Sequence, residues 1–223
     1  DNVDQKAAAE LGIKVSNTPE APAEAVAEMT VAALLALNRQ LVPANTALHM
    51  GEWKKTIGSG LKGQKVLLLG FGRIGRRTAE LLRVFGAELM ACDPQWNSAE
   101  AERLGVRRAV LPEALAEADV ISLHAAGRDT LLGAAEFARM RPGVALLNSA
   151  RGDLIDEAAL IAALEKGVVV RVWLDVFCEE PYRGVLTKFP QVLLTPHIGT
   201  YTRQCRLEME TAAVANLLRD LGL

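Results

Sequence analysis

Residues 65–75 read KVLLLGFGRIG, an apolar run that ends in three closely spaced glycines. The run Lys65–Leu69 predicts a strand buried on both faces, because it is apolar after its first residue and shows no polar alternation. Residues 74–85 predict the helix that follows. This stretch therefore predicts a strand, a glycine turn and a helix in immediate succession.

The three glycines have the spacing G-x-G-x-x-G, and each has a distinct role in such a turn. Gly70 permits the tight turn, Gly72 allows a pyrophosphate to approach the backbone, and Gly75 allows the helix to pack closely on the strand. The helix start then presents free N–H groups to the phosphates. The spacing alone is weak evidence, since it also occurs in plain turns, but here it lies between a predicted strand and a predicted helix.

A carboxylate after the next strand indicates which dinucleotide would bind. Asp93 follows the predicted strand Glu88–Cys92 and lies 18 residues after Gly75. A carboxylate there accepts hydrogen bonds from both ribose hydroxyls of the adenosine and repels a 2′-phosphate. Residues 94–96 supply no arginine for that phosphate. We expect NAD rather than NADP; the alternative is a glycine-rich turn beside an ordinary surface aspartate.

Strands and helices alternate downstream of this turn. Apolar runs predict strands at Glu88–Cys92, 120–124, 144–147, 168–175 and Val192–Leu194. Helices are expected at 99–104, 111–118, 134–140 and 156–166, and a last helix at 203–218. The pattern predicts the α/β class with a doubly wound parallel sheet, the Rossmann architecture.

The segment before the turn has a different pattern. Residues 4–11 predict a helix and residues 13–16 a short strand. Residues 22–47 predict a long helix that is apolar on most faces, which indicates burial against two partners. Pro43 should kink or break this helix. The glycine-rich residues 50–63 predict a loop or an extended arm.

Composition argues against several classes of protein. The formal net charge is −2, without the basic stripe of a nucleic-acid-binding protein. No apolar run reaches the roughly 18 residues of a membrane span, and the opening DNVDQK is neither a signal peptide nor a lipidation motif. The three cysteines (Cys92, Cys178, Cys205) lack paired spacing, so we expect no disulfide framework and no metal site. A cytoplasmic protein without nucleic-acid or membrane partners is expected.

Three further motifs follow predicted strands. Residues 148–152 read NSARG and are followed by DEAAL at 156–160; residues 174–181 read LDVFCEEP; residues 195–199 read TPHIG. In order and separation they resemble the N-x-A-R-G, L-D-V-F-x-x-E-P and T-P-H-I-G signatures of the D-isomer-specific 2-hydroxyacid dehydrogenases. Asp1-Asn2-Val3-Asp4 and Gly51-Glu52-Trp53 are similar to further landmarks of that family.

The resemblance implies an oxidoreductase that transfers a hydride between NAD(H) and a small D-2-hydroxy acid or 2-keto acid. His197 would be the acid/base group, since histidine titrates near neutrality. Glu180 would orient its ring and favour its protonated form; Glu179 is a close rival. Arg151 would bind the substrate carboxylate through its planar fork, and Asp175 resembles the family residue that holds the nicotinamide carboxamide.

The same resemblance gives a set of cofactor contacts. The expected cofactor-binding residues are Gly70, Gly72, Arg73, Ile74, Gly75, Asp93, His124, Ala150, Asp175 and Gly199. Each has a plainer alternative: an arginine in a loop is usually a solvated surface residue, and His124 could simply end its strand. His49 is interpreted as structural or exposed.

The chain departs from the family pattern in places. Family members begin with a longer stretch that forms most of a second, flavodoxin-like substrate domain. Residues 1–20 are therefore interpreted as a remnant of that domain, 21–202 as the NAD-binding domain, and 203–223 as a C-terminal helix that returns toward the substrate domain. The missing stretch would carry substrate contacts, so the activity of this chain by itself is left open.

Two smaller differences lie beside the predicted site. The family usually shows a longer loop with x-P-L-T after the residue matching His124, where this chain has Ala125-Ala126-Gly127-Arg128. The family also prefers small residues before Asp175, whereas here Arg171-Val172-Trp173 precede it. We expect their bulk to reshape the back wall of the pocket.

Partners and alternatives complete the prediction. Residues 21–63 resemble the family's dimerisation helix and arm, so a homodimer is expected. One alternative function is an NAD(H)-sensing interaction module of the corepressor type, and another is a formate- or phosphite-oxidising relative. The sequence leaves open which 2-hydroxy acid would be the substrate.

Overall fold

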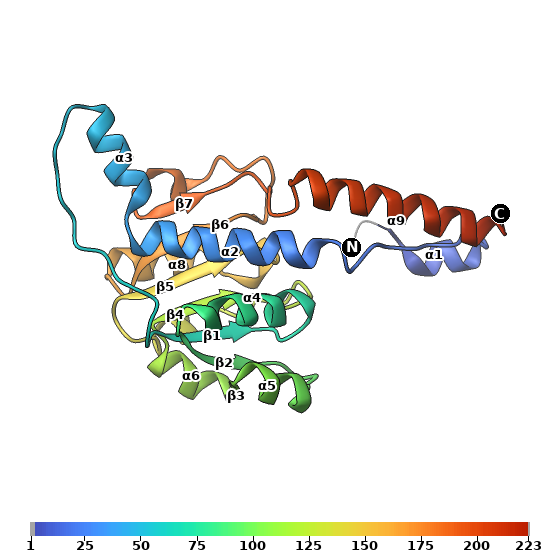
Figure 1. Ribbon diagram of the computed structural model, residues 1–223, viewed down its shortest axis with the longest axis horizontal. Helices are drawn as coiled ribbons and strands as arrows, with labels where there is room; N and C mark the ends of the chain where they lie inside the picture. The colour runs from blue at the N-terminus through green and yellow to red at the C-terminus, as the bar shows by residue number, and fades with distance from the viewer. Residues whose placement is uncertain (1–2, 223) are drawn as a thin grey trace.

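The core of the molecule is a seven-stranded parallel sheet with the strand order β3-β2-β1-β4-β5-β6-β7. The structure is a computed structural model that describes residues 3–222. Asp1 and Asn2, the first two residues of the Asp1-Asn2-Val3-Asp4 segment noted above, therefore lie outside the described residues. The strands are β1 (Lys65–Leu69), β2 (Glu88–Cys92), β3 (Val106–Arg108), β4 (Val120–Leu123), β5 (Val144–Asn148), β6 (Val169–Leu174) and β7 (Val192–Leu194). The predicted doubly wound parallel sheet is confirmed (Figure 1).

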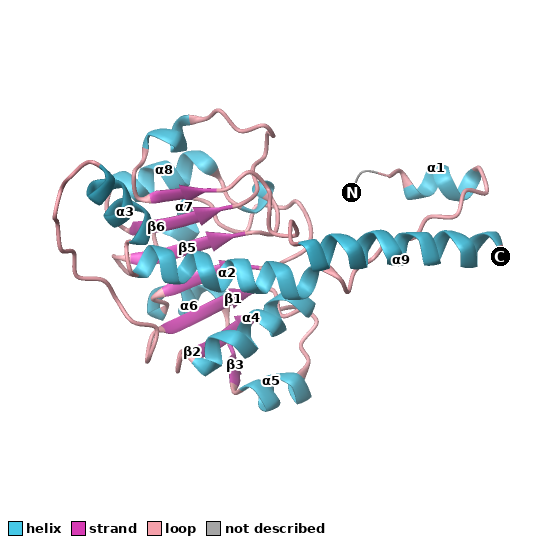
Figure 2. Cartoon of the chain, turned by 45° about the horizontal axis from the view of Figure 1, so that its top comes forward, coloured by secondary structure: helices cyan, strands magenta, loops and turns pink. Residues whose placement is uncertain are grey.

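Helices cover both faces of this sheet (Figure 2). Those on one face are α2 (Pro22–Asn38), α4 (Arg73–Val84) and α5 (Ser98–Leu104). Those on the other are α6 (Leu111–Glu117), α7 (Ala134–Phe137) and α8 (Glu157–Glu165). Successive residues of β1 enter opposite cores: Val66 and Leu68 pack with α2 and α4, whereas Leu67 and Leu69 pack with α6 and α8. Burial on both faces explains why these strands are apolar without alternation.

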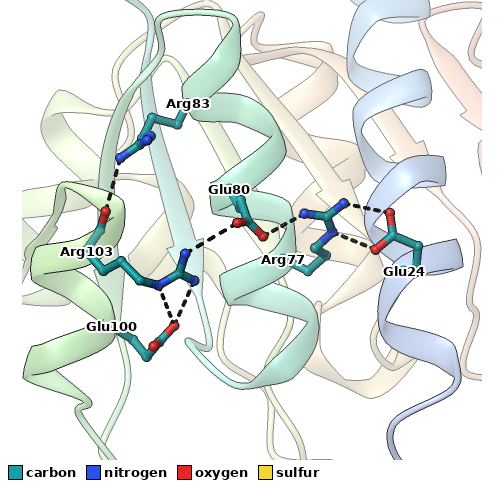
Figure 3. A network of polar contacts seen from close by, with 6 residues as sticks. All are labelled: Glu24, Arg77, Glu80, Arg83, Glu100 and Arg103. Carbon is teal, nitrogen blue, oxygen red and sulfur yellow. Dashed lines mark hydrogen bonds and ion pairs between the residues drawn. The ribbon is translucent and has the colours of Figure 1, made fainter.

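A chain of charged side chains ties the helices of the first face together (Figure 3). Arg77 of α4 forms two bonds to Glu24 of α2, with N···O distances of 2.6 and 2.8 Å, and a third bond of 2.6 Å to Glu80. Arg103 of α5 continues the chain to Glu80 and Glu100. The Arg77 guanidinium lowers the pKa of Glu24. Exposed pairs stabilise little individually, but this network links α2 and α5 to α4, which lies between them.

Two segments lie outside this layered body. Helix α9 (Arg203–Leu221) projects from one end of it, and α1 (Gln5–Glu10) with the following residues runs beside α9 (Figures 1 and 2). The Asn216 amide donates to the Asn17 carbonyl over 3.0 Å, and Lys14 bonds the Asp220 carbonyl. The first and last parts of the described chain therefore form one unit, separate from the sheet.

The structure corrects two expectations about elements and adds one strand that was not predicted. Residues 13–16 are not a strand, because they run beside α9, where no sheet edge is available for pairing. The long helix breaks at Gln40, which has a φ of 51°, and not at Pro43. Pro43 lies in the first turn of α3 (Leu41–His49), where a helix needs no N–H donor. Strand β3 was not predicted, because it has three residues and two of them are arginines.

The arm 50–63 is irregular, as predicted. Two short 3₁₀ turns, η1 (Gly152–Leu154) and η2 (Val185–Lys188), complete the described elements. Among residues 3–222, no single helix is long and apolar enough to cross a membrane; α2 and α3 reach that length and composition only as a pair bent by 59°.

Candidate active site

The predicted site residues follow the carboxyl ends of neighbouring strands. The glycine turn follows β1, Asp93 follows β2 and His124 follows β4. Arg151 follows β5, Asp175 follows β6 and His197 follows β7. Because all seven strands are parallel, these ends share one edge of the sheet. That edge is where open α/β sheets bind ligands.

The glycine turn has the shape that a dinucleotide requires. Gly70 has a φ of +104°, and a Cβ there would lie 2.6 Å from the Ala125 nitrogen. A Cβ on Gly75 would lie 2.2 Å from the Gly70 carbonyl oxygen, so helix and turn pack too closely for a side chain. A Cβ on Gly72, by contrast, would meet no atom within 4 Å. No side chain caps the start of α4 at Gly72. The first N–H groups of the helix are therefore accessible there, and they suit the phosphates of a dinucleotide.

Asp93 is fixed beside that turn by two backbone donors. Its Oδ2 accepts from the Phe71 N–H over 2.6 Å, and its Oδ1 accepts from the Gln95 N–H over 2.7 Å. Trp96 stacks on Phe71 with ring centroids 5.2 Å apart. The Arg108 guanidinium lies 5.6 Å from the Trp96 ring, an arginine that the sequence analysis missed because β3 was not predicted.

His197 and Glu180 form the predicted pair. The His197 Nδ1 lies 2.9 Å from Glu180 Oε2, and the other carboxylate oxygen accepts from the Phe177 N–H over 3.1 Å. Burial alone would raise the pKa of Glu180, but the hydrogen bonds from His197 and Phe177 outweigh it and lower that pKa. Both candidate carboxylates are exposed, but Glu180 is the one that contacts His197.

A mainly apolar cavity of about 600 Å³ opens beside this pair. His197 and Glu180 lie in its wall together with Phe177 and Tyr182, whose rings stack with centroids 4.4 Å apart. The Tyr182 hydroxyl donates to Glu157 over 2.8 Å, which fixes the ring. The pair therefore borders a space that could hold a small molecule with an apolar part.

The loop that carries Arg151 is held by a side chain whose role the sequence analysis missed. Asn148 is 1% exposed at the end of β5. Its amide donates to the Arg151 carbonyl over 2.8 Å, and its oxygen accepts from the Ala150 N–H over 3.0 Å. The asparagine that begins the N-x-A-R-G motif could have indicated this role, because the polar atoms of a buried asparagine at a strand end must form hydrogen bonds nearby.

Gly152 brings the Arg151 loop against the segment that leads to Glu180. A Cβ on Gly152 would lie 2.1 Å from the Phe177 carbonyl carbon and 2.3 Å from the Cys178 nitrogen. We expect Gly152→Ala to push these backbones apart and to lower kcat/KM by about 10- to 100-fold, since displacements of this size are costly in an active site. Steady-state kinetics would measure the change.

Gly60→Ala is the matched control for that substitution, since a Cβ on Gly60 meets nothing within 4 Å. It should leave both kcat/KM and the NADH affinity unchanged. Gly152→Ala kinetics within twofold of the parent protein would contradict the proposed packing role.

His124 lies next to the glycine turn but in a different environment from His197. Its Nε2 is 2.9 Å from the Ser122 hydroxyl, and its Nδ1 is buried without a hydrogen-bond partner among residues 3–222. Burial lowers the pKa of His124 to about 4. A ring that stays neutral at physiological pH is a poor acid/base group, which favours its predicted place in the cofactor wall over a catalytic one.

This low pKa gives a pH dependence of stability. The unfolded chain binds a proton on His124 near pH 6.5, which the folded protein excludes until about pH 4. The free energy of unfolding should therefore fall by on the order of 3 kcal/mol as the pH falls from 7 to 4. Chemical denaturation at several pH values should show a shallower loss for His124→Asn and an unchanged loss for His49→Asn, on an exposed histidine. Identical curves for His124→Asn and the parent protein would contradict this assignment.

Cys178 lies in the segment that leads from β6 to Glu180. Burial and the nearby Asp153 and Glu157 carboxylates raise the pKa of Cys178, which disfavours its thiolate. Within residues 3–222, no cluster of three histidine, cysteine or acidic side chains could hold a metal ion.

Comparison with known proteins agrees with this geometry. Residues 31–199 match the family model described as D-isomer specific 2-hydroxyacid dehydrogenase, NAD binding domain. The chain is 36% identical to a glyoxylate reductase of Thermococcus litoralis, over 98% of this chain and 70% of the relative. It is also 36% identical to a D-3-phosphoglycerate dehydrogenase of Bacillus subtilis, over 98% of this chain but only 43% of that relative. The crystal structure of a glyoxylate reductase from Paecilomyes thermophila superposes with a TM-score of 0.91 and 39% identity, covering 97% of this chain and 68% of that one.

Proposed function

Because this chain belongs to the D-isomer specific 2-hydroxyacid dehydrogenases and carries their NAD-binding domain, we propose that it transfers a hydride between NAD(H) and a small D-2-hydroxy acid or 2-keto acid. The observation that carries the proposal is the His197–Glu180 hydrogen bond of 2.9 Å, at the sheet edge that also bears the glycine turn and Arg151. An acid/base pair beside a dinucleotide site is what carbonyl reduction needs.

Each residue of the pair and of the Arg151 loop has a distinct task. Glu180 accepts from His197 Nδ1, which leaves Nε2 as the atom that gives a proton to the substrate carbonyl oxygen or takes it back. Arg151 binds the substrate carboxylate, and Asn148 holds its loop in place. NADH, when bound, supplies the hydride.

The pyrophosphate and adenosine of the cofactor would lie along the first half of this edge, and its nicotinamide end would reach the second half. Gly70, Gly72 and Gly75 form the turn for its pyrophosphate, and Asp93 binds the adenosine ribose. The remaining residues proposed to line the cofactor are Arg73, Ile74, His124, Ala150, Asp175 and Gly199. Asp175 and Gly199 also bond one another, because the Gly199 N–H donates to Asp175 Oδ2 over 2.7 Å.

The direct test follows NADH oxidation by the purified protein with glyoxylate, pyruvate, hydroxypyruvate and its 3-phosphate. Turnover with at least one of these 2-keto acids, and none with formate or phosphite in the oxidative direction, is the expected result. Tight NADH binding without turnover on any substrate would contradict activity of this chain by itself. The same assay with a substrate domain of the family added would then separate a dehydrogenase from an NAD(H)-sensing module.

We further propose a division into domains. Residues 1–20 are a remnant of a substrate domain, 21–202 form the NAD-binding domain, and 203–223 form a C-terminal helix that returns toward the substrate domain. The bonds that Lys14 and Asn17 form with α9, away from the sheet, support this. So do the apolar side chains that α9 leaves exposed, among them Leu207, Val214 and Leu217, because such a surface is typically covered by further protein.

A homodimer is proposed on similar grounds. No described residue of α3 is buried, although Leu41, Val42 and Leu48 are apolar. Trp53 and Ile57 of the arm are 81% and 98% exposed. Sedimentation at micromolar concentration should give a dimer for the parent protein and a monomer for Leu48→Glu; a clean monomer for the parent protein would contradict the proposal.

Three free cysteines support a reducing, cytoplasmic location.

A further inference from the structure

The turn that carries His197 has an unfavourable backbone conformation. His197 has a φ of 54°, in the left-handed region that residues with a side chain rarely adopt. Among residues 3–222, Gln40 is the one other residue besides glycines with positive φ. Such a conformation persists only where the surroundings hold it, so the groups that hold this turn determine where the imidazole points.

Asp175 holds the turn on both sides of His197. This carboxylate is 1% exposed. Its Oδ1 accepts from the Thr195 hydroxyl over 2.6 Å and from the Ile198 N–H over 2.9 Å, while its Oδ2 accepts from the Gly199 N–H. Two of these donors follow His197 in the chain and one precedes it, so a single buried group spans the strained residue.

Trp173 extends this arrangement into the core. Its side chain is fully buried and packs in the core between the sheet and α2, and the cavity beside His197 is lined by Thr195 and not by Trp173 itself. Its indole N–H donates to the Thr195 hydroxyl oxygen over 2.9 Å. Indole can only donate and carboxylate can only accept, so the direction is fixed: Trp173 to Thr195 to Asp175.

We propose that Trp173 is a positioning residue for His197, acting through the hydrogen-bond chain from Trp173 through Thr195 to Asp175. The indole N–H fixes the rotamer of the Thr195 hydroxyl, and the hydroxyl fixes the Asp175 oxygen that also receives the Ile198 N–H. Donors in series polarise one another and strengthen the last bond. This inference rests on the proposed function only where catalysis is measured.

Loss of the indole N–H should lower kcat more than it changes the affinity for the 2-keto acid or for NADH. Without it, the Thr195 hydroxyl gains rotational freedom and the turn can relax, which displaces His197 from its catalytic orientation. We expect Trp173→Phe to lower kcat by about 10-fold while KM for the 2-keto acid and Kd for NADH change less than twofold. Thr195→Val should act similarly and Thr195→Ser should retain most of the parent rate.

The experiment combines kinetics with a direct view of the imidazole. The chain has three histidines, so the ring ¹⁵N signals of His197 can be assigned by their loss in His197→Gln. Trp173→Phe and Thr195→Val should each shift these signals in the absence of substrate. The double variant should be no worse than either single one, since both break one chain.

A packing control separates positioning from stability. Leu147 lies opposite Trp173 on β5 and is fully buried. Leu147→Ala should lower Tm but leave the His197 signals and kcat in place. Parent-like His197 signals in both Trp173→Phe and Thr195→Val would overturn the proposal. If the parent protein shows no turnover, the proposed function fails, while the NMR comparison still tests the hydrogen-bond chain.

Discussion

Replacing His197 by glutamine is expected to lower kcat for reduction of a 2-keto acid by about 10²- to 10⁴-fold, the usual contribution of a positioned acid/base group. Glutamine preserves much of the side-chain size and can still bond Glu180, but it has no proton to transfer near neutral pH. The loss should appear in kcat, because the imidazole acts on the reacting carbonyl. Kd for NADH, measured by fluorescence, should stay within a factor of two.

The two adjacent glutamates provide a matched comparison for this prediction. Glu180→Gln removes the charge that contacts His197, whereas Glu179→Gln removes a charge of the same kind from an exposed neighbour. We expect a large fall in kcat for the first and a near-parent value for the second. A His197→Gln protein that retains more than a tenth of the parent kcat would rule out His197 as the acid/base group.

Arg151→Gln is expected to lower kcat/KM by about 100-fold, and saturation should require much higher substrate concentration. Two charge-assisted bonds to a substrate carboxylate together contribute about 3 kcal/mol. Arg151→Lys should recover only a small part of this loss, since an ammonium cannot form the same parallel pair of bonds. Initial-rate kinetics over a range of 2-keto acid concentrations would measure both changes.

Arg141 is the matched control for Arg151. It forms an ion pair with Asp119, which precedes β4 at the opposite edge of the sheet. Arg141→Gln should leave kcat/KM unchanged. An Arg151→Gln protein with parent-like KM for every 2-keto acid tested would place the substrate carboxylate elsewhere.

The elements most accurately predicted from sequence were those with purely local signals. Strand β2 and strand β7 were predicted with their observed bounds, because short apolar runs between polar residues indicate buried strands. Strand β3 was missed, since its arginines hide a pairing that only the neighbouring β2 provides. The helix break was placed at Pro43 because proline is a strong local signal, yet the chain turns at Gln40.

The site residues also divide into those with a local sequence signal and those whose role depends on the folded structure. The types of residue that carry out acid/base work and carboxylate binding could be selected by their motifs, and the His197–Glu180 contact agrees with that selection. The local bonds of Asn148 had a signal in the N-x-A-R-G motif that was not used. The contact of Thr195 with Asp175 could not be predicted, because it depends on side-chain orientations across the ends of β6 and β7. Trp173 was noticed as a departure from the family pattern, but only its burial and its bond to Thr195 indicate a role.

The strand order has an evolutionary consequence. Residues proposed to select the dinucleotide follow β1 and β2, whereas those proposed to bind and protonate the substrate follow β5, β6 and β7, with β4 between the two groups. Mutations in one group therefore change surfaces that the other group does not build. Selection can exchange the cofactor preference, or broaden the range of acids accepted, in separate steps, without passing through an intermediate that has lost both.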